Sequence, residues 1–276
     1  CERKEVRSMI ENCDGHLPRR KTVWVPRPIG KGKWRKAWKR SRISKKALKT
    51  VSKVVSVGAP IELRVAPKKA KRIYITDTEV NHLAHSLATP TDIIIPTHFI
   101  DSMAGPLMKK KSNFHRIDGL HGHIHLHPHM RPSSISNPPK VMVRRLLGDG
   151  IHDSDEIEKI PDNWLDGLNL SYADEDEVKG NPWDLISKIS EMDGVITQSV
   201  TLASEAVLLG VPTLLVSKAK RGFLDRLVSE GYPLFIAKEN DDSILAAWLA
   251  GIHLTDALDE PGWTNARSEL IDLIKD

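Results

Sequence analysis

Short apolar runs alternate with segments of helical spacing through most of this 276-residue chain. Such runs indicate strands that are buried on both faces. Strands that alternate with helices favour a parallel sheet with helices packed on both sides. We therefore expect an α/β fold, with strands in the runs KTVWVP, KVVSVGAP, KRIYITDTE, TDIIIPTHF, VMVRRLL, GVITQ, VPTLLVS and YPLFIA.

The two halves of the chain differ in charge. Residues 1–150 contain 31 Lys and Arg against 11 Asp and Glu, whereas residues 151–276 contain 10 against 25. Such asymmetry indicates two domains with different surfaces. The stretch RPSSISNPPK is rich in Pro, Ser and Asn and is the best linker candidate. We predict a basic N-terminal domain over residues 1–135 and an acidic C-terminal domain over residues 136–276.

Neither a membrane span nor a secretory signal is visible in the sequence. No apolar run approaches the ~18 residues that cross a bilayer, and the start of the chain lacks a signal-peptide pattern. The two cysteines, Cys1 and Cys13, do not form a disulfide framework. We expect a cytoplasmic protein with reduced thiols, with peripheral contact to a membrane as an option.

Residues 19–53 form a basic segment with fifteen Lys or Arg, no acidic residue, and the tryptophans Trp24, Trp34 and Trp38. One interpretation is a solvated basic helix with buried tryptophans. A second is a surface that binds an anionic membrane or a lipid or glycan acceptor, since interfacial segments combine Lys and Arg with Trp. Nucleic acid is a weaker option, because no recognisable nucleic-acid motif accompanies the charge.

The stretch DGLHGHIHLHPHM places a histidine at every second position. The histidines are His121, His123, His125, His127 and His129, and the positions between them include Leu120, Ile124 and Leu126. Because strand residues alternate between faces, we expect a half-buried strand with its histidines on one side. A catalytic zinc would need a further ligand that this spacing does not identify. Structural or substrate-facing histidines are therefore favoured over adventitious metal at His123 and His125, and metal-dependent hydrolysis is the third reading.

The segment from Asp193 to Ser217 predicts a strand, a turn of small hydroxylated residues and a helix. Helix N-termini bind phosphate through free N–H groups and the helix dipole. Ser199 and Thr201 can cap this terminus, and Glu205, farther along the same helix, can accept hydrogen bonds from a ribose. An ordinary capped helix is the alternative.

Five motifs resemble, in order, a GT-B-like family of archaeal type labelled domain of unknown function 354, which is related to glycosyltransferases and nucleotide-sugar 2-epimerases. They are SVGAP, ITDTE, RIDGLHGHIHLHP, VMVRRLLGDGIHD and SVTLASEAVLLGVPTLLVS. The resemblance implies two Rossmann-like domains facing a cleft, with a nucleotide-sugar held by the C-terminal domain. It implies that Ser199 and Thr201 face the diphosphate and Glu205 the ribose, with Arg144 and His152 also binding the nucleotide-sugar.

The resemblance further implies glycosyl transfer, with inversion, to a membrane-proximal or anionic acceptor brought by the N-terminal domain. His121, Glu79 and Asp77 are the candidate catalytic bases, with His121 preferred because imidazole titrates near neutral pH. A 2-epimerase reaction would use the same cleft and is kept as an alternative to glycosyl transfer. No metal or other cofactor is expected.

Two departures from the family pattern matter. The family usually has glycine where Ser199 stands, followed by a small residue where this chain has Val200. A non-catalytic binding module with a degraded nucleotide site is therefore the alternative. The N-terminal domain also starts at what resembles its second helix, so we expect that domain to be incomplete, and the segment 153–181 to have lost part of a βα unit.

Overall fold

The computed structural model describes most of the chain and forms two compact units. The described residues are 7, 10, 22–28, 30–119, 121–126, 135–146, 158–173, 182–254 and 264–275. Unit 1 comprises Cys1–Asp118, Asn181–Trp183 and Ser268–Asp276, and unit 2 comprises Gly119–Gly180 and Asp184–Arg267. The division at Asp118 lies upstream of the linker expected near residue 135.

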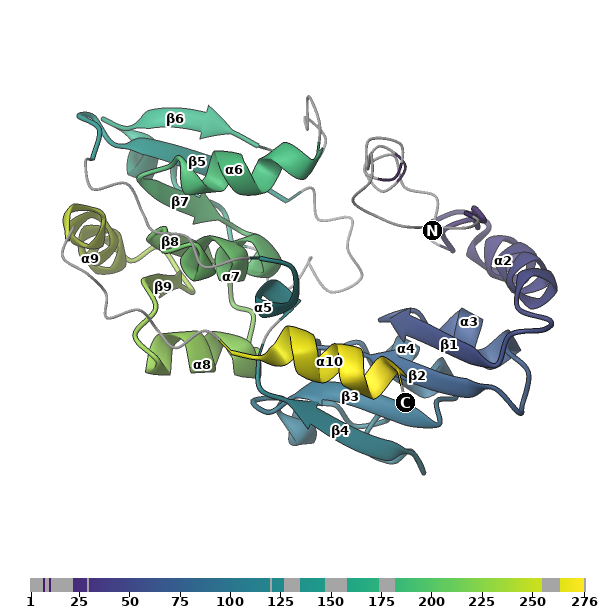
Figure 1. Ribbon diagram of the computed structural model, residues 1–276. Helices are drawn as coiled ribbons and strands as arrows, with labels where there is room; N and C mark the ends of the chain where they lie inside the picture. The colour runs from purple at the N-terminus through teal and green to yellow at the C-terminus, as the bar shows by residue number, and fades with distance from the viewer. Residues whose placement is uncertain are drawn as a thin grey trace. The chain divides into compact units, whose positions relative to one another are not determined.

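Unit 1 contains a four-stranded parallel sheet (Figure 1). Its strands are β1 (Lys53–Val57), β2 (Lys71–Ile75), β3 (Asp92–Pro96) and β4 (Asn113–Ile117), and they lie side by side in sequence order. All five residues of β3 are buried, as its apolar run predicts. β1 buries only alternate residues, which is typical of a strand with one covered face.

Within residues 30–118, the described helices of unit 1 are α2 (Lys33–Ala47), α3 (Pro60–Val65), α4 (His82–Leu87) and the short 3-10 helix η1 (Asp101–Met103). α3 begins with Pro60 at its first position, where a missing N–H costs nothing. Its Leu63 is fully buried in one apolar cluster with β2 and β3 side chains such as Tyr74 and Ile93. This cluster is the core of unit 1.

The helix α10 (Ala266–Lys275) supplies the last part of unit 1. The Nζ atom of Lys53 on β1 lies 2.5 Å from the carbonyl oxygen of Ile274 and 2.7 Å from that of Lys275. The backbone N–H of Asp118 donates to Glu269 at 3.2 Å. A lysine that binds the last carbonyls of a helix satisfies acceptors that the helix itself leaves open.

Unit 2 contains a five-stranded parallel sheet with the order β6-β5-β7-β8-β9. The strands are β5 (Lys140–Arg144), β6 (Asn169–Tyr172), β7 (Gly194–Thr197), β8 (Thr213–Val216) and β9 (Leu234–Ala237). The first strand lies second in the sheet, so the chain winds outward in both directions from the β5–β7 pair. This order is that of a doubly wound sheet whose direction reverses between β5 and β7.

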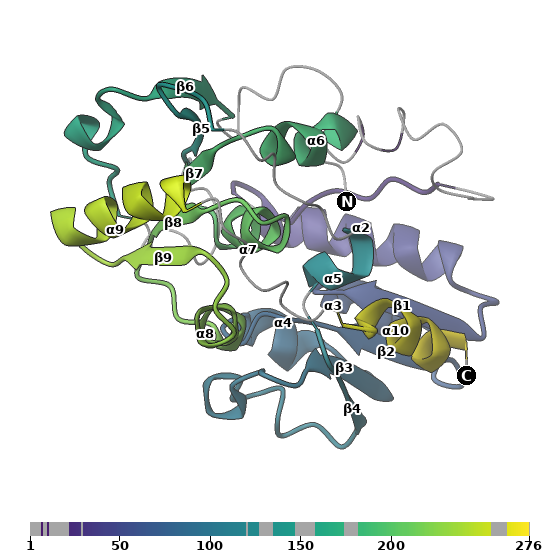
Figure 2. The same cartoon turned by 60° about the vertical axis from the view of Figure 1, so that its left-hand side comes forward.

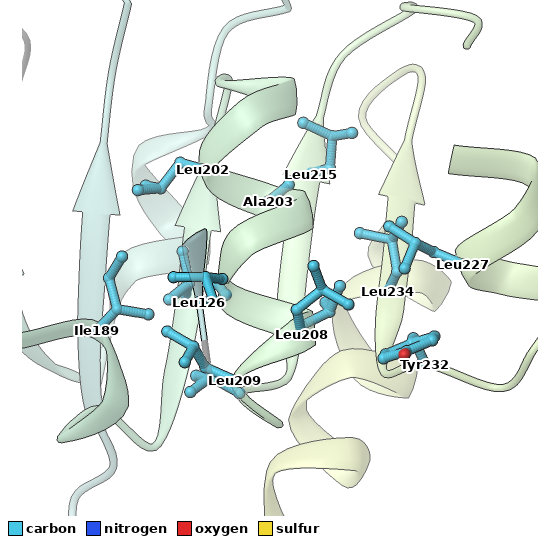
Figure 3. Packing of buried hydrophobic residues seen from close by; sticks show 14 of the residues in the cluster. Leu126, Ile189, Leu202, Ala203, Leu208, Leu209, Leu215, Leu227, Tyr232 and Leu234 are labelled. Atoms are coloured by element: carbon cyan, nitrogen blue, oxygen red, sulfur yellow. The ribbon is translucent and has the colours of Figure 1, made fainter. Parts of the chain in front are cut away.

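Two apolar clusters cover the two faces of the unit 2 sheet. One joins Met142, Val195 and Leu215 to α6 (Leu185–Ser190), α7 (Val200–Leu208) and α8 (Gly222–Ser229), and part of it is shown in Figure 3. The other joins the neighbouring residues of the same strands to the 3-10 helix η2 (Asp162–Leu165) and to α9 (Asp242–His253), through Trp164 and Trp248. Successive strand residues thus enter opposite cores, which explains the continuous apolar runs.

The histidine-rich stretch is not a strand, which corrects our prediction. Residues His121–His125 form the short helix α5, and the strand of this region is β4, immediately upstream. Figures 1 and 2 both show α5 beside α7. In a helix the alternating histidines do not share a face. His121 and His125 lie one turn apart on one side, whereas His123 is buried on another.

Another segment differs from expectation. Residues 22–26, predicted as a strand, belong to no strand, although Val25 is buried. In the segment 153–181 the described residues 158–173 contain η2 and the edge strand β6, which pairs with β5, and the loss of part of a βα unit there stays a prediction. Within the described ranges, no helix is both long enough and apolar enough to cross a bilayer.

Candidate functional site

The point where the unit 2 sheet reverses direction is the strongest candidate site. Arg144 and Thr197 are paired residues at the carboxyl ends of β5 and β7. The chain that follows β7 enters α7 on one face of the sheet, whereas the described residues that follow β5 pack on the other face. Ligands of open α/β sheets bind beyond the carboxyl ends of the strands at this position.

Ser199 caps the helix that leaves β7. Its hydroxyl oxygen accepts a hydrogen bond from the backbone N–H of Leu202 at 3.3 Å, and its own N–H donates to Thr197 at 2.9 Å. The predicted cap is therefore confirmed for Ser199. Thr201 is exposed on the first turn, and Val200 is the first helical residue.

Arg144 lies where the sequence placed it, at the end of β5. Its Nη1 atom donates to the carbonyl oxygen of Ala173 at 3.2 Å, beyond the end of β6. The guanidinium is therefore held beside the carboxyl ends of the central strands. His152, the other residue expected near this strand end, lies outside the described residues.

Gln198 is a further residue of this region that the sequence did not reveal. Its side chain is 8% exposed and bridges two loops. The backbone N–H of Leu146 donates to its Oε1 at 2.8 Å, and its Nε2 donates to the carbonyl oxygen of Glu158 at 2.6 Å. Gln198 therefore ties the chain after β5 to the start of α7. The only indication of its role in the sequence was that Gln198 directly precedes Ser199.

Glu205 of α7 pairs with two histidines of α5. Its Oε1 lies 3.2 Å from Nε2 of His125 and 3.7 Å from Nε2 of His121, and its side chain is 14% exposed. Burial raises the pKa of a carboxyl group, but hydrogen bonds and charge from His121 and His125 outweigh it and lower the pKa of Glu205 to about 2. The carboxylate is thus ionised at neutral pH.

Two contacts position the ring of His125. Its Nδ1 lies 2.9 Å from the carbonyl oxygen of His121, and its Nε2 faces the carboxylate of Glu205. His121 stacks on it with ring centroids 5.9 Å apart and meets the ring of Phe223 edge-on.

These side chains do not form a recognisable metal centre. Across the ranges described above, no three His, Cys, Asp or Glu side chains are grouped so that they could hold a metal. His123 is 2% exposed, and His127 and His129 lie outside the described residues.

The acidic candidates of the N-terminal half lie in unit 1, after β2. Asp77 accepts a hydrogen bond from the hydroxyl of Thr78 at 3.1 Å. Glu79 is fully buried and accepts the backbone N–H of Ile100 at 3.2 Å, so it anchors the chain after β3. His121, the third candidate base, belongs to unit 2 and lies beside Glu205.

The described part of the chain contains two α/β units with parallel sheets of four and five strands. The solved structure of TarM, a glycosyltransferase, is similar, with a TM-score of 0.50 and 13% sequence identity. The similarity covers 86% of this chain and 56% of the TarM chain, so the chain spans little more than half of that protein.

No protein-family model matches the sequence, and comparison with curated proteins finds no match. Membership of the family that the five motifs resemble therefore stays a prediction, and the solved structure supports the fold alone.

Proposed function

We propose that the protein binds a nucleotide-sugar in unit 2 and transfers the sugar to an acceptor. The observation that carries this proposal is the β5–β7 reversal, where Arg144, Gln198 and the capped N-terminus of α7 meet. A phosphate group is stabilised by free helix N–H groups and by arginine. The similarity of fold to a glycosyltransferase is consistent with this choice.

Each site residue has a role in the proposal. Ser199 and Thr201 face the diphosphate, with Arg144 and His152 beside it, and Glu205 accepts hydrogen bonds from the ribose. His121 and His125 keep the Glu205 carboxylate ionised and oriented, which suits an acceptor of hydroxyl hydrogens.

The base that activates the acceptor is drawn from His121, Asp77 and Glu79. The complete burial of Glu79 favours the other two, since a general base must reach the proton that it removes. Unit 1 recruits the acceptor, for which an anionic or membrane-proximal molecule fits its charge. A 2-epimerase reaction would use the same nucleotide site, and product analysis separates the two reactions.

A thermal-shift panel of UDP, GDP, CDP and TDP with their sugars tests the binding step. A ligand at a hundred times its dissociation constant stabilises the folded state by ~2.7 kcal/mol, which corresponds to a rise in Tm of several degrees. Glu205→Gln should reduce the affinity roughly tenfold or more, because it replaces a charged acceptor. The matched control is Glu191→Gln, an exposed glutamate at the end of α6.

Failure of every nucleotide to raise Tm would overturn the proposal. It would then favour the second candidate, a non-catalytic binding module. The Ser199–Val200 turn supports this candidate, because Ser199 stands where a glycine would let a diphosphate approach and Val200 stands where a small residue is usual. Val200→Gly separates the two candidates. A functional site should gain little affinity, whereas a degraded site should regain nucleotide binding.

A further inference from the structure

The helix α2 has one side fixed to unit 1. Arg40 makes two hydrogen bonds to Glu62 of α3, at 2.8 and 2.7 Å, and Ser44 donates to the same carboxylate at 3.1 Å. Arg40 and Ser44 are the buried residues of α2, and they lie one turn apart. A two-pronged arginine–carboxylate pair has a defined geometry. It therefore sets which side of α2 faces away from unit 1.

The outward side of α2 combines basic and aromatic residues. Trp34 and Trp38 are 79% and 60% exposed, which is unusual for such large apolar side chains. Eight of the 15 residues of α2 are Lys or Arg, and none is acidic. At 100° per residue, the side opposite Arg40 carries a set that we call the Trp–basic face: Trp34, Arg35, Trp38, Lys39, Arg42, Lys45 and Lys46.

We propose that the Trp–basic face docks the protein on a membrane surface that contains anionic phospholipids. Lys and Arg near such a surface are attracted to the lipid phosphates, and tryptophan is enriched at the level of the headgroups. Trp34 and Trp38 lie one turn apart, so both rings reach the interface when the helix lies flat on it. The Arg40–Glu62 pair holds the helix in the orientation that presents them.

Single-stranded nucleic acid is the competing partner, and the ring contacts favour lipid. Nucleic-acid binders stack bases on open aromatic faces along a basic groove. Here the guanidinium of Arg42 lies 4.7 Å from the centre of the Trp38 ring, and Nζ of Lys33 lies 5.7 Å from that of Trp34. Each cation lies over one face of its ring and leaves fewer open faces for bases to stack on, whereas the exposed ring edges suit a lipid interface.

This inference deepens the proposed function by naming the partner of unit 1, but its test needs no nucleotide. The full chain is sedimented with phosphatidylcholine vesicles that contain or lack phosphatidylglycerol, at low and high salt. We expect binding only to the anionic vesicles, and weaker binding as salt screens the charges. Equal binding to both vesicle types, or to neither, would overturn the proposal.

Two variants locate the surface. Arg35→Gln with Lys39→Gln should weaken vesicle binding roughly 30-fold, at about fivefold per cation, and Trp34→Ala with Trp38→Ala roughly tenfold or more. The matched control is Lys68→Ala with Lys69→Ala, two exposed lysines outside α2, which should change binding far less. Circular dichroism verifies that each variant is folded.

Fluorescence provides a second readout, because tryptophan emission shifts to shorter wavelength in an apolar environment. Anionic vesicles should produce this shift in the natural chain and not in a Trp34→Phe, Trp38→Phe variant. A single-stranded RNA that binds more tightly than the vesicles and depends on the same residues would assign the Trp–basic face to nucleic acid instead. Vesicle binding without any nucleotide effect would uphold this inference while the proposed function fails.

Discussion

Gly122 of α5 packs directly against the side chain of Leu208 of α7, and a Cβ atom at Gly122 would overlap it. This close approach positions α5 so that His121 and His125 face Glu205. Gly122→Ala should therefore destabilise the protein by about 1–3 kcal/mol, the usual cost of overpacking, although alanine favours helices. Urea unfolding measures the change.

Leu208→Ala supplies the control for this prediction. Alone it should cost about 2–5 kcal/mol, because Leu208 is buried. The double variant with Gly122→Ala should lose clearly less free energy of unfolding than the sum of the two single losses. The new methyl group at position 122 then occupies the space that the Leu208 side chain has left. Strict additivity would show that Gly122 and Leu208 do not limit each other.

Glu205 should contribute to stability against acid. Its folded pKa of about 2 lies below the ordinary value of 4.5, so the contribution is complete above pH 4.5 and is lost as pH falls toward 2. The difference corresponds to about 3 kcal/mol. The free energy of unfolding, measured between pH 5 and pH 2, should therefore fall less steeply with decreasing pH in Glu205→Gln. Glu191→Gln should keep the steeper fall of the natural chain. Parallel acid limbs in the two variants would refute the ion pair.

Loss of the Ser199 cap should have a modest and specific cost. Ser199→Ala removes the acceptor of the Leu202 N–H and should destabilise by about 1 kcal/mol. Ser199→Gly should destabilise the protein by only about a few tenths of a kcal/mol, because glycine is itself tolerated at the first capping position of a helix. Ser187→Ala, on the exposed side of α6, is the neutral control. Chemical denaturation distinguishes these values, and equal effects of the alanine and glycine changes would contradict the capping role.

Gln198 should be important for stability at the site. Gln198→Ala leaves the Leu146 N–H and the Glu158 carbonyl without this partner, and we expect a loss of about 1–3 kcal/mol. Gln198→Glu keeps the acceptor for Leu146 but loses the donor to Glu158, so its loss should fall in between at neutral pH. Hydrogen exchange of the Leu146 amide reports the first bond directly and should rise only in the alanine variant.

The sequence predicted the apolar strands, including β1 and β9 at two sheet edges, and missed the polar edge strands β4 and β6. β3, β7 and β8 are apolar because both of their faces are covered, and this makes them visible in the sequence. β4 and β6 are edge strands whose polar residues give no apolar run. The histidine stretch fitted the strand period, but its residues His121–His125 form a helix in which Gly122 packs against Leu208 of α7, a contact that the sequence does not show.

The candidate site was predictable where backbone topology determines it. Arg144 and Ser199 follow neighbouring strands of a parallel sheet, so their shared edge follows from the strand pattern. The partners of Glu205 were not predictable, because α5 is far from α7 in the sequence and its position depends on tertiary packing. Gln198 was missed for the same reason, since both of its partners are distant loop atoms.

The residues Ser268–Asp276 belong to unit 1, and Lys53 near the start of that unit binds the end of their helix. A ribosome makes these residues after all the strands of unit 2. Unit 1 therefore gains its contacts with these residues only after the strands of unit 2 have been made, and unit 2 can fold while synthesis continues. A nascent chain halted before Ser268 would carry a finished second unit and an unfinished first one.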